Sequence, residues 1–171
     1  MDTYDHVDEY INSRVTDKDT RLLISDFAIL WNQYEKALYD GEHHIGRIKS
    51  MIENHYEITQ IENLDDLYNR FLKYLESRNT PFNYNGIINA YNIRIKSELG
   101  DKGDLLAKDL ENAIYVKTSF SKIHLLLIIA AKVRNNMFHG TKDTSKLDKQ
   151  KELFKICNEL LMSILEITNL K

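Results

Sequence analysis

The stretch that decides the fold is residues 119–140, SFSKIHLLLIIAAKVRNNMFHG, in which seven consecutive apolar side chains (residues 125–131) lie between polar ends. A helix through this stretch is apolar on every face over its middle, so other elements must surround it. The apolar run is too short to cross a bilayer, which takes about 20 residues. The stretch therefore predicts the central helix of a bundle.

The rest of the chain offers helices that can surround this one, because apolar residues recur at intervals of three and four. Stripes of this kind occupy residues 20–39, 64–75, 88–99, 106–114 and 154–164, and a shorter helix is expected near 47–56. One proline and six glycines in 171 residues leave few turns for a sheet, and no segment alternates as a strand does. We expect one all-α domain over residues 1–171, a helical bundle of five to seven helices.

Polar residues mark where these helices are expected to begin and end. Gly41 and Gly100 follow the stripes at 20–39 and 88–99 as natural stops. The expected N-caps are Asn63, Asp104, either Ser119 or Ser121, and Ser145 with Asp148 as a capping box for the last helix.

Composition indicates the cellular setting. A single cysteine, Cys157, excludes an internal disulfide, fits a reducing compartment and has the helical apolar neighbours of a core thiol. The first five residues, MDTYD, are acidic and lack the apolar run of a secretory signal. We expect a cytoplasmic protein that has no membrane partner.

Charge is unevenly distributed along the chain. The formal net charge of -3 argues against extensive contact with nucleic acid. Residues 132–155, however, hold seven lysines and arginines against three acids. Any nucleic acid is therefore expected to be held locally, near the end of the apolar helix.

The end of the apolar helix carries Arg134, Asn135 and His139, followed by Gly140. Asn135 and His139 are four residues apart and share a helix face, with Arg134 beside them, while Val133, Met137 and Phe138 are expected to pack inward. Gly140 can adopt the left-handed conformation that ends a helix. His139 would then lie in the last turn, where the helix dipole favours its protonated form.

These three side chains are the types that RNA cleavage without a metal requires. His139 can transfer protons, Arg134 can hold two phosphate oxygens at once, and Asn135 can orient either of them. Lys142 can add affinity for phosphate. No metal ion and no cofactor are expected. One chain supplies one histidine at this place, so a symmetric homodimer that joins two copies in one cleft is expected.

The string Arg134-Asn135-Asn136-Met137-Phe138-His139-Gly140 resembles the signature of the HEPN superfamily, an arginine and a histidine separated by four to six residues, with a polar residue usually following the arginine. The resemblance implies a dimeric, metal-independent endoribonuclease of a toxin or anti-viral defence system. Its implied partners are RNA and an antitoxin or regulatory protein. Inactive family members serve as dimerisation or nucleotide- or partner-binding modules, so that alternative stays open.

The first long helix in proteins of that superfamily often contributes polar residues to the cleft. Asn32 and Glu35 are the matching candidates for substrate binding, and a solvated helix face is the alternative. In some of those toxins a tyrosine two residues after the histidine is modified by a partner. Thr141 stands at that position here, so this mode of neutralisation is not expected.

The remaining histidines have simpler interpretations. His43 and His44 are expected in a solvent-facing turn after Gly41, because no carboxylate spacing supports a metal site with them or with His55. His124 precedes His139 by about 22 Å along a straight helix and cannot join it within one chain. The chain has no Walker-type loop and no glycine-rich dinucleotide motif, so a nucleoside triphosphatase is not expected.

Overall fold

The computed structural model describes residues 9–10, 17–97, 103–138 and 144–169. This part of the chain contains α2 (Lys18–Tyr39), α3 (Ile48–Asn54), α4 (Leu64–Ser77), α5 (Tyr84–Tyr91), α6 (Ala107–Tyr115), α7 (Ser119–Phe138) and α8 (Lys151–Asn169). Three 3₁₀ segments, η1 (Ile45–Arg47), η2 (Tyr56–Gln60) and η3 (Thr144–Gln150), and the two-residue strands β1 (Ile95–Lys96) and β2 (Leu105–Leu106) complete it. The predicted all-α bundle is confirmed.

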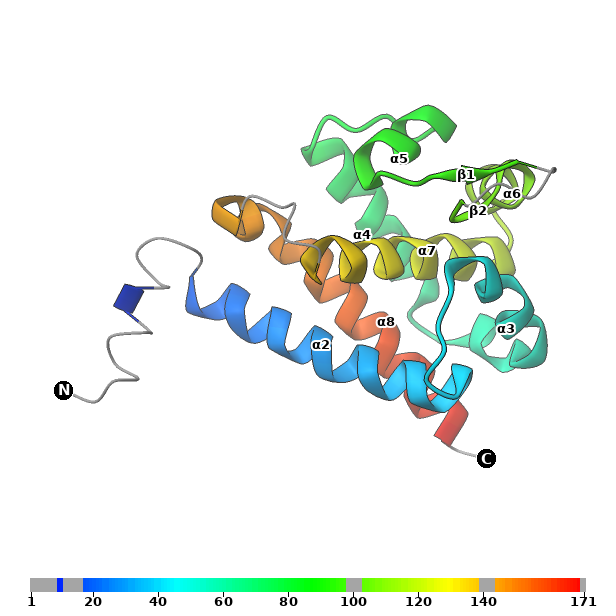
Figure 1. The fold of residues 1–171 in the computed structure, drawn as a ribbon, viewed down its shortest axis with the longest axis horizontal. Coiled ribbons are helices and arrows are strands. Elements are labelled where there is room, and N and C mark those ends of the chain that lie inside the picture. The colour runs from blue at the N-terminus through cyan, green and yellow to red at the C-terminus, as the bar shows by residue number, and fades with distance from the viewer. Residues whose placement is uncertain (1–8, 11–16, 98–102, 139–143, 170–171) are drawn as a thin grey trace.

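Helix α7 lies at the centre of the bundle, as its sequence predicts. In Figure 1 it crosses the middle of the molecule, with α2 and α8 on one side and α5 with the strands on the other. It packs against α3, α4, α5, α6 and α8. Every residue from Ile123 to Val133 is buried, which explains why this helix needs no polar face.

Helices α2 and α8 form the most extensive helix pair. The ring of Phe27 on α2 meets that of Phe154 on α8 edge-on, with centroids 5.9 Å apart. The Asp17 carboxylate caps α2 by accepting a hydrogen bond from the Thr20 N–H at 2.7 Å. At the other end, Asp40 (φ 52°) and Gly41 (φ 82°) adopt left-handed conformations, so the helix stops where Gly41 predicts.

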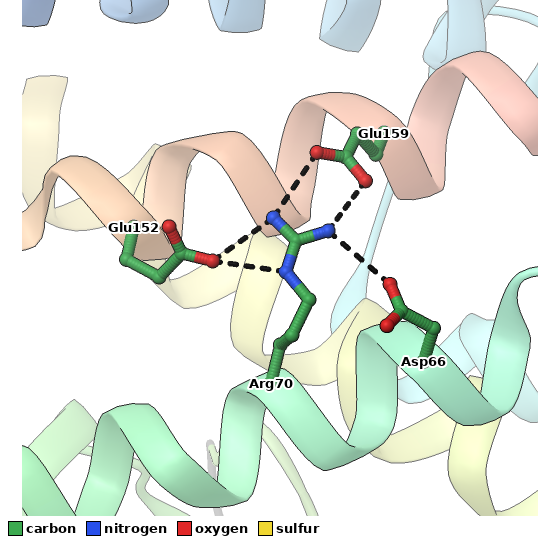
Figure 2. Close-up of polar contacts among 4 residues, drawn as sticks. All are labelled: Asp66, Arg70, Glu152 and Glu159. Carbon is green, nitrogen blue, oxygen red and sulfur yellow. Dashed lines mark hydrogen bonds and ion pairs between the residues drawn. The ribbon is translucent and has the colours of Figure 1, made fainter.

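An arginine on α4 ties that helix to α8. Figure 2 shows the Arg70 guanidinium between three carboxylates. Its Nη1 lies 2.6 Å from Glu159 Oε2, its Nε donates to Glu152 Oε1 at 2.9 Å, and Asp66, four residues before it, lies at 3.4 Å. Because two of the three carboxylates belong to α8, the network fixes the contact between the two helices.

Several expected N-caps are wrong in detail. Asn63 does precede α4, but its side chain makes no capping hydrogen bond. Asp104 caps no helix: α6 begins after Leu106, and the Asp104 carboxylate is used elsewhere. For α7 the capping side chain is Thr118, whose Oγ1 accepts from the Ser121 N–H at 3.2 Å. The side chain of Ser145 lies outside the described residues, whereas Asp148 accepts from the Asp17 N–H.

The helix expected over residues 88–99 is shorter than its apolar stripe. Helix α5 ends at Tyr91, because Asn92 takes the left-handed conformation (φ 51°), which asparagine tolerates. Ile95 then pairs in parallel with Leu105 in the β1–β2 ladder. Leu99 and Gly100 lie outside the described residues. The stripe therefore assigned Ile95 to the wrong type of element.

Two further expectations concern burial and membranes. Cys157 is buried in the core, as predicted, and burial raises the pKa of its thiol to about 12. Among the described helices, none is by itself long and apolar enough to span a membrane. Helices α6 and α7 together reach that length and composition, but they are bent by 119° from each other.

Candidate functional site

A pocket of about 260 Å³ lies at the end of α7. Its lining comes from α2, from the segment that leads into η1, from the residues flanking the β1–β2 ladder, and from α7: Trp31, Glu35, His43, His44, Ile45, Arg94, Asp104, Arg134 and Asn135. We call it the Arg134 pocket. It contains three of the residues that sequence analysis selected, namely Arg134, Asn135 and Glu35.

Arg134 and Asn135 enter the pocket from the last described turn of α7. Both are half-buried, and Arg134 Nη1 donates to Asn135 Oδ1 at 3.2 Å. On the opposite side of the same turn, Val133 is buried and Met137 packs against the core. The predicted division of this turn is therefore confirmed for these four residues, whereas the side chains of Phe138 and His139 lie outside the described part.

Glu35 reaches the pocket from α2 with its carboxylate held in place. Trp31 Nε1 donates to Glu35 Oε2 at 2.9 Å, and the His43 N–H donates to Oε1 at 3.5 Å. Asn32, the other candidate on α2, is exposed and does not line the pocket. The structure thus brings one of the two α2 candidates to the motif.

Two of the expected site residues cannot be placed. His139 and Lys142 lie outside the described residues, which stop at 138 and resume at 144. The expectation that His139 shares the face of Asn135 stays a prediction from the helical spacing of these residues.

His43 is the residue that sequence analysis placed wrongly. It does not face solvent but packs edge-on against Tyr39 and Trp31, with ring centroids 4.6 and 4.7 Å away. Burial, and then the neighbouring charges of Arg134 and His44, lower the pKa of His43 to about 4. The imidazole is therefore uncharged at neutral pH. The solvent-facing turn is correct for His44, which is exposed and caps η1.

The left-handed residues Asp40 and Gly41 explain this misplacement. They reverse the chain after α2 and return the next residues onto that helix. The sequence signals the turn through Gly41 but not the direction in which the chain leaves it. The spacing of Trp31, Tyr34 and Tyr39 was the sequence signal that could have placed His43, because these aromatic rings need a further side chain packed against them to be buried.

Asp104, which lines the pocket, forms a buried ion pair with Lys132. Lys132 Nζ lies 3.0 Å from Asp104 Oδ2, and their side chains are only 7% and 11% exposed. Asp104 Oδ2 also accepts from the Arg94 N–H at 2.8 Å, while the Arg94 guanidinium is largely exposed at 3.9 Å from Oδ1. Lys132 is the one lysine within the buried stretch of α7 from Ile123 to Val133, and its position was the signal in the sequence that an acid had to lie nearby.

The pocket therefore combines opposite charges with an uncharged imidazole. Arg134 and Arg94 can bind phosphate or carboxylate oxygens, and Glu35 and His43 can accept protons. Within the described ranges, no three His, Cys, Asp or Glu side chains gather closely enough to hold a metal ion. The arrangement suits proton transfer and anion binding.

A second buried histidine lies far from this pocket. His124, which is 4% exposed, lines a separate pocket of about 300 Å³ beside the Lys49–Asp109 ion pair. It precedes Arg134 by ten residues on α7, which is about 15 Å along the helix axis. His124 therefore takes no part in the Arg134 pocket.

Comparison with known proteins adds no relative. No family model, no curated protein and no solved structure matches the chain. Membership of the HEPN superfamily thus stays a prediction from the motif. The function is inferred from the residues of the Arg134 pocket.

Proposed function

We propose that this chain is a metal-independent endoribonuclease of HEPN type, with a role as a toxin or in anti-viral defence. The observation that carries the proposal is that Arg134 and Asn135 of the motif line one pocket with Glu35 from the first long helix. Glu35 precedes Arg134 and Asn135 by about a hundred residues in the sequence. Their meeting in one pocket is the arrangement that a shared catalytic role requires.

The proposed reaction uses the RNA itself as the nucleophile. The 2′-hydroxyl oxygen forms a bond to the neighbouring phosphorus and gives its proton to a base, while the bond from phosphorus to the 5′-oxygen breaks and that oxygen takes a proton from an acid. The products carry a 2′,3′-cyclic phosphate and a 5′-hydroxyl. Arg134 stabilises the negative charge on the phosphorane, Asn135 orients a reacting group, and His139 transfers a proton.

The proposal includes a homodimer. Two copies of the motif in one cleft would double the arginines available to an extended RNA strand, and Lys142 would bind a flanking phosphate. A protein that covered the cleft, such as an antitoxin, would silence the enzyme. Gel filtration with light scattering tests the dimer independently of activity.

A second candidate is a module that binds a small polar ligand and cleaves nothing. Two features of the pocket favour it. The pocket holds only about 260 Å³, and Glu35 and Asp104 add negative charge beside the two arginines. Such mixed charge suits a small molecule with both donors and acceptors better than it suits a polyanion.

One experiment separates the two candidates. Purified wild-type protein and the His139→Ala variant are incubated with total RNA in EDTA, and the ends of the products are analysed. We expect wild-type cleavage that leaves cyclic phosphates, with a loss of at least about 100-fold in the variant, the usual contribution of a general acid or base. Equal cleavage by both proteins, or cleavage by wild type only when a divalent metal is added, would refute the proposal.

A further inference from the structure

The pocket contains a histidine that the motif does not include, and its ring is accessible on one side only. His43 Nε2 is enclosed and has no hydrogen-bond partner in the described part of the chain. Nδ1 has no such partner there either, but it is not enclosed, and His43 lines the Arg134 pocket. Of the two ring nitrogens, Nδ1 is therefore the one that a bound molecule can reach.

The aromatic surroundings favour one tautomer of His43. The imidazole packs against the rings of Trp31, Tyr34 and Tyr39, at 4.6 to 6.2 Å between centroids, and Nε2 is its enclosed nitrogen. An N–H at Nε2 can be directed at an aromatic π-system, whereas a lone pair there would meet no donor. The proton then belongs on Nε2, and Nδ1 presents its lone pair to the pocket.

Burial is the main reason why the ring of His43 stays uncharged, and the charged groups around it add to this effect and fix its position. Arg134 approaches from α7 and His44 from the neighbouring position in the chain, and both oppose protonation. Glu35 on α2 receives the His43 backbone N–H, so its carboxylate anchors the backbone next to the ring. Arg94 and Asp104 complete the charged lining from the opposite wall.

We propose that His43 is a catalytic residue of the Arg134 pocket and that its Nδ1 accepts the proton of the attacking 2′-hydroxyl. This inference rests on the proposed ribonuclease function and assigns its base to a residue outside the motif. The proton leaves the hydroxyl as its oxygen bonds to phosphorus, and the electron pair of the breaking bond goes to the 5′-oxygen. His139, protonated, then supplies the proton to that oxygen.

The position of Arg134 supports this role. A proton on His43 is unfavourable next to the guanidinium while the pocket is empty. When the proton arrives from the RNA, the phosphorane gains negative charge at the same time, and that charge offsets the cations of both His43 and Arg134. Proton transfer is thus favoured only together with attack on phosphorus, which is the behaviour required of a base in this reaction.

The test compares His43→Gln with His55→Gln, a change at a histidine that follows α3 and does not line the Arg134 pocket. RNA cleavage is measured as kcat/KM with one oligonucleotide, and circular dichroism shows whether each variant is folded. We expect His43→Gln to lose about 100-fold or more and His55→Gln to stay within about threefold of wild type. A His43→Gln variant that cleaves at the wild-type rate would overturn the inference and leave the proposed function standing.

A second measurement needs no variant. If His43 is the base, kcat/KM of the wild type rises and then levels off as the pH falls from 7.5 to 5.5, because the acid becomes protonated while His43, with a pKa of about 4, stays an uncharged base. A base with the ordinary histidine pKa of about 6.5 would instead make kcat/KM pass through a maximum and fall again at lower pH, and that result would also overturn the inference. If wild-type protein cleaves no RNA at any pH, the proposed function itself fails, and the role of His43 fails with it.

Discussion

The two parts of α7 differ in what surrounds them. From Ile123 to Val133 every residue is buried, and only His124 and Lys132 carry a titratable group. From Arg134 to Met137 every residue is half-buried and the outward side is polar. One continuous helix therefore supplies core packing over most of its length and a site at its end. The buried part of α7 therefore holds the site in position, because it is packed on all sides and cannot rotate.

The two parts meet at Lys132, whose amine is buried against Asp104. We expect Asp104→Ala to have the largest effect on stability, because it leaves the Lys132 ammonium buried without its partner. Loss of one member of a buried ion pair costs about 3–5 kcal/mol of unfolding free energy. Urea denaturation measures it. The double variant Asp104→Ala with Lys132→Met should recover much of the loss. If the unfolding free energy of Asp104→Ala alone lies within about 1 kcal/mol of wild type, the Lys132 ammonium does not depend on Asp104 for its burial.

The buried part also predicts a dependence of stability on pH. Burial lowers the pKa of His124 to about 4 in the folded protein, against about 6.5 in the unfolded chain. Between these values the unfolded state binds more protons, so the free energy of unfolding falls as the pH drops from 6.5 to 4. The loss from this residue is about 3 kcal/mol.

Chemical denaturation at pH 7 and at pH 4.5 measures this dependence in wild type and in His124→Gln. We expect a smaller difference between the two pH values in the variant, whereas His55→Gln, a change at a more exposed histidine, should behave as wild type. Identical pH dependence in wild type and His124→Gln would show that His124 is not held uncharged by the core.

The last turn should show the smallest effect on stability. Asn135→Ala removes a half-buried side chain whose described hydrogen bond is to the adjacent Arg134. We expect a change in unfolding free energy of less than about 1 kcal/mol, together with a clear loss of RNA cleavage. Thermal unfolding and the oligonucleotide assay, run on the same preparation, measure both. A large destabilisation would mean that this turn belongs to the core rather than to the site.

The fold was predictable wherever the spacing of apolar side chains along the sequence decides the structure. The apolar run at 125–131 required a central helix. The stripes of α4 and α8 pack on that helix, and the stripe of α2 packs on α8. The sequence did not predict the structure where the path of the chain depends on the backbone conformation of a single residue. Asn92 ends α5 in a left-handed conformation, and nothing in the stripe that continues to Ile95 indicates this.

The site was predictable in part for the same reason. Arg134 and Asn135 follow from their place at the end of a buried helix, and Glu35 was a candidate only through the resemblance to the HEPN superfamily. His43, Arg94 and Asp104 come from segments whose paths depend on tertiary contacts: the reversal after Asp40 and the pairing of β1 with β2. Only Lys132, a cation with apolar neighbours, indicated from the sequence that a carboxylate would be found beside it.

The buried thiol of Cys157 has a practical consequence. It is the one cysteine of the chain, and its raised pKa keeps it in the unreactive thiol form at neutral pH. A cysteine introduced on the exposed face of α2 could therefore carry a fluorophore or spin label without prior removal of the natural one. Distances between two labelled copies would then reveal directly how the molecules associate in solution.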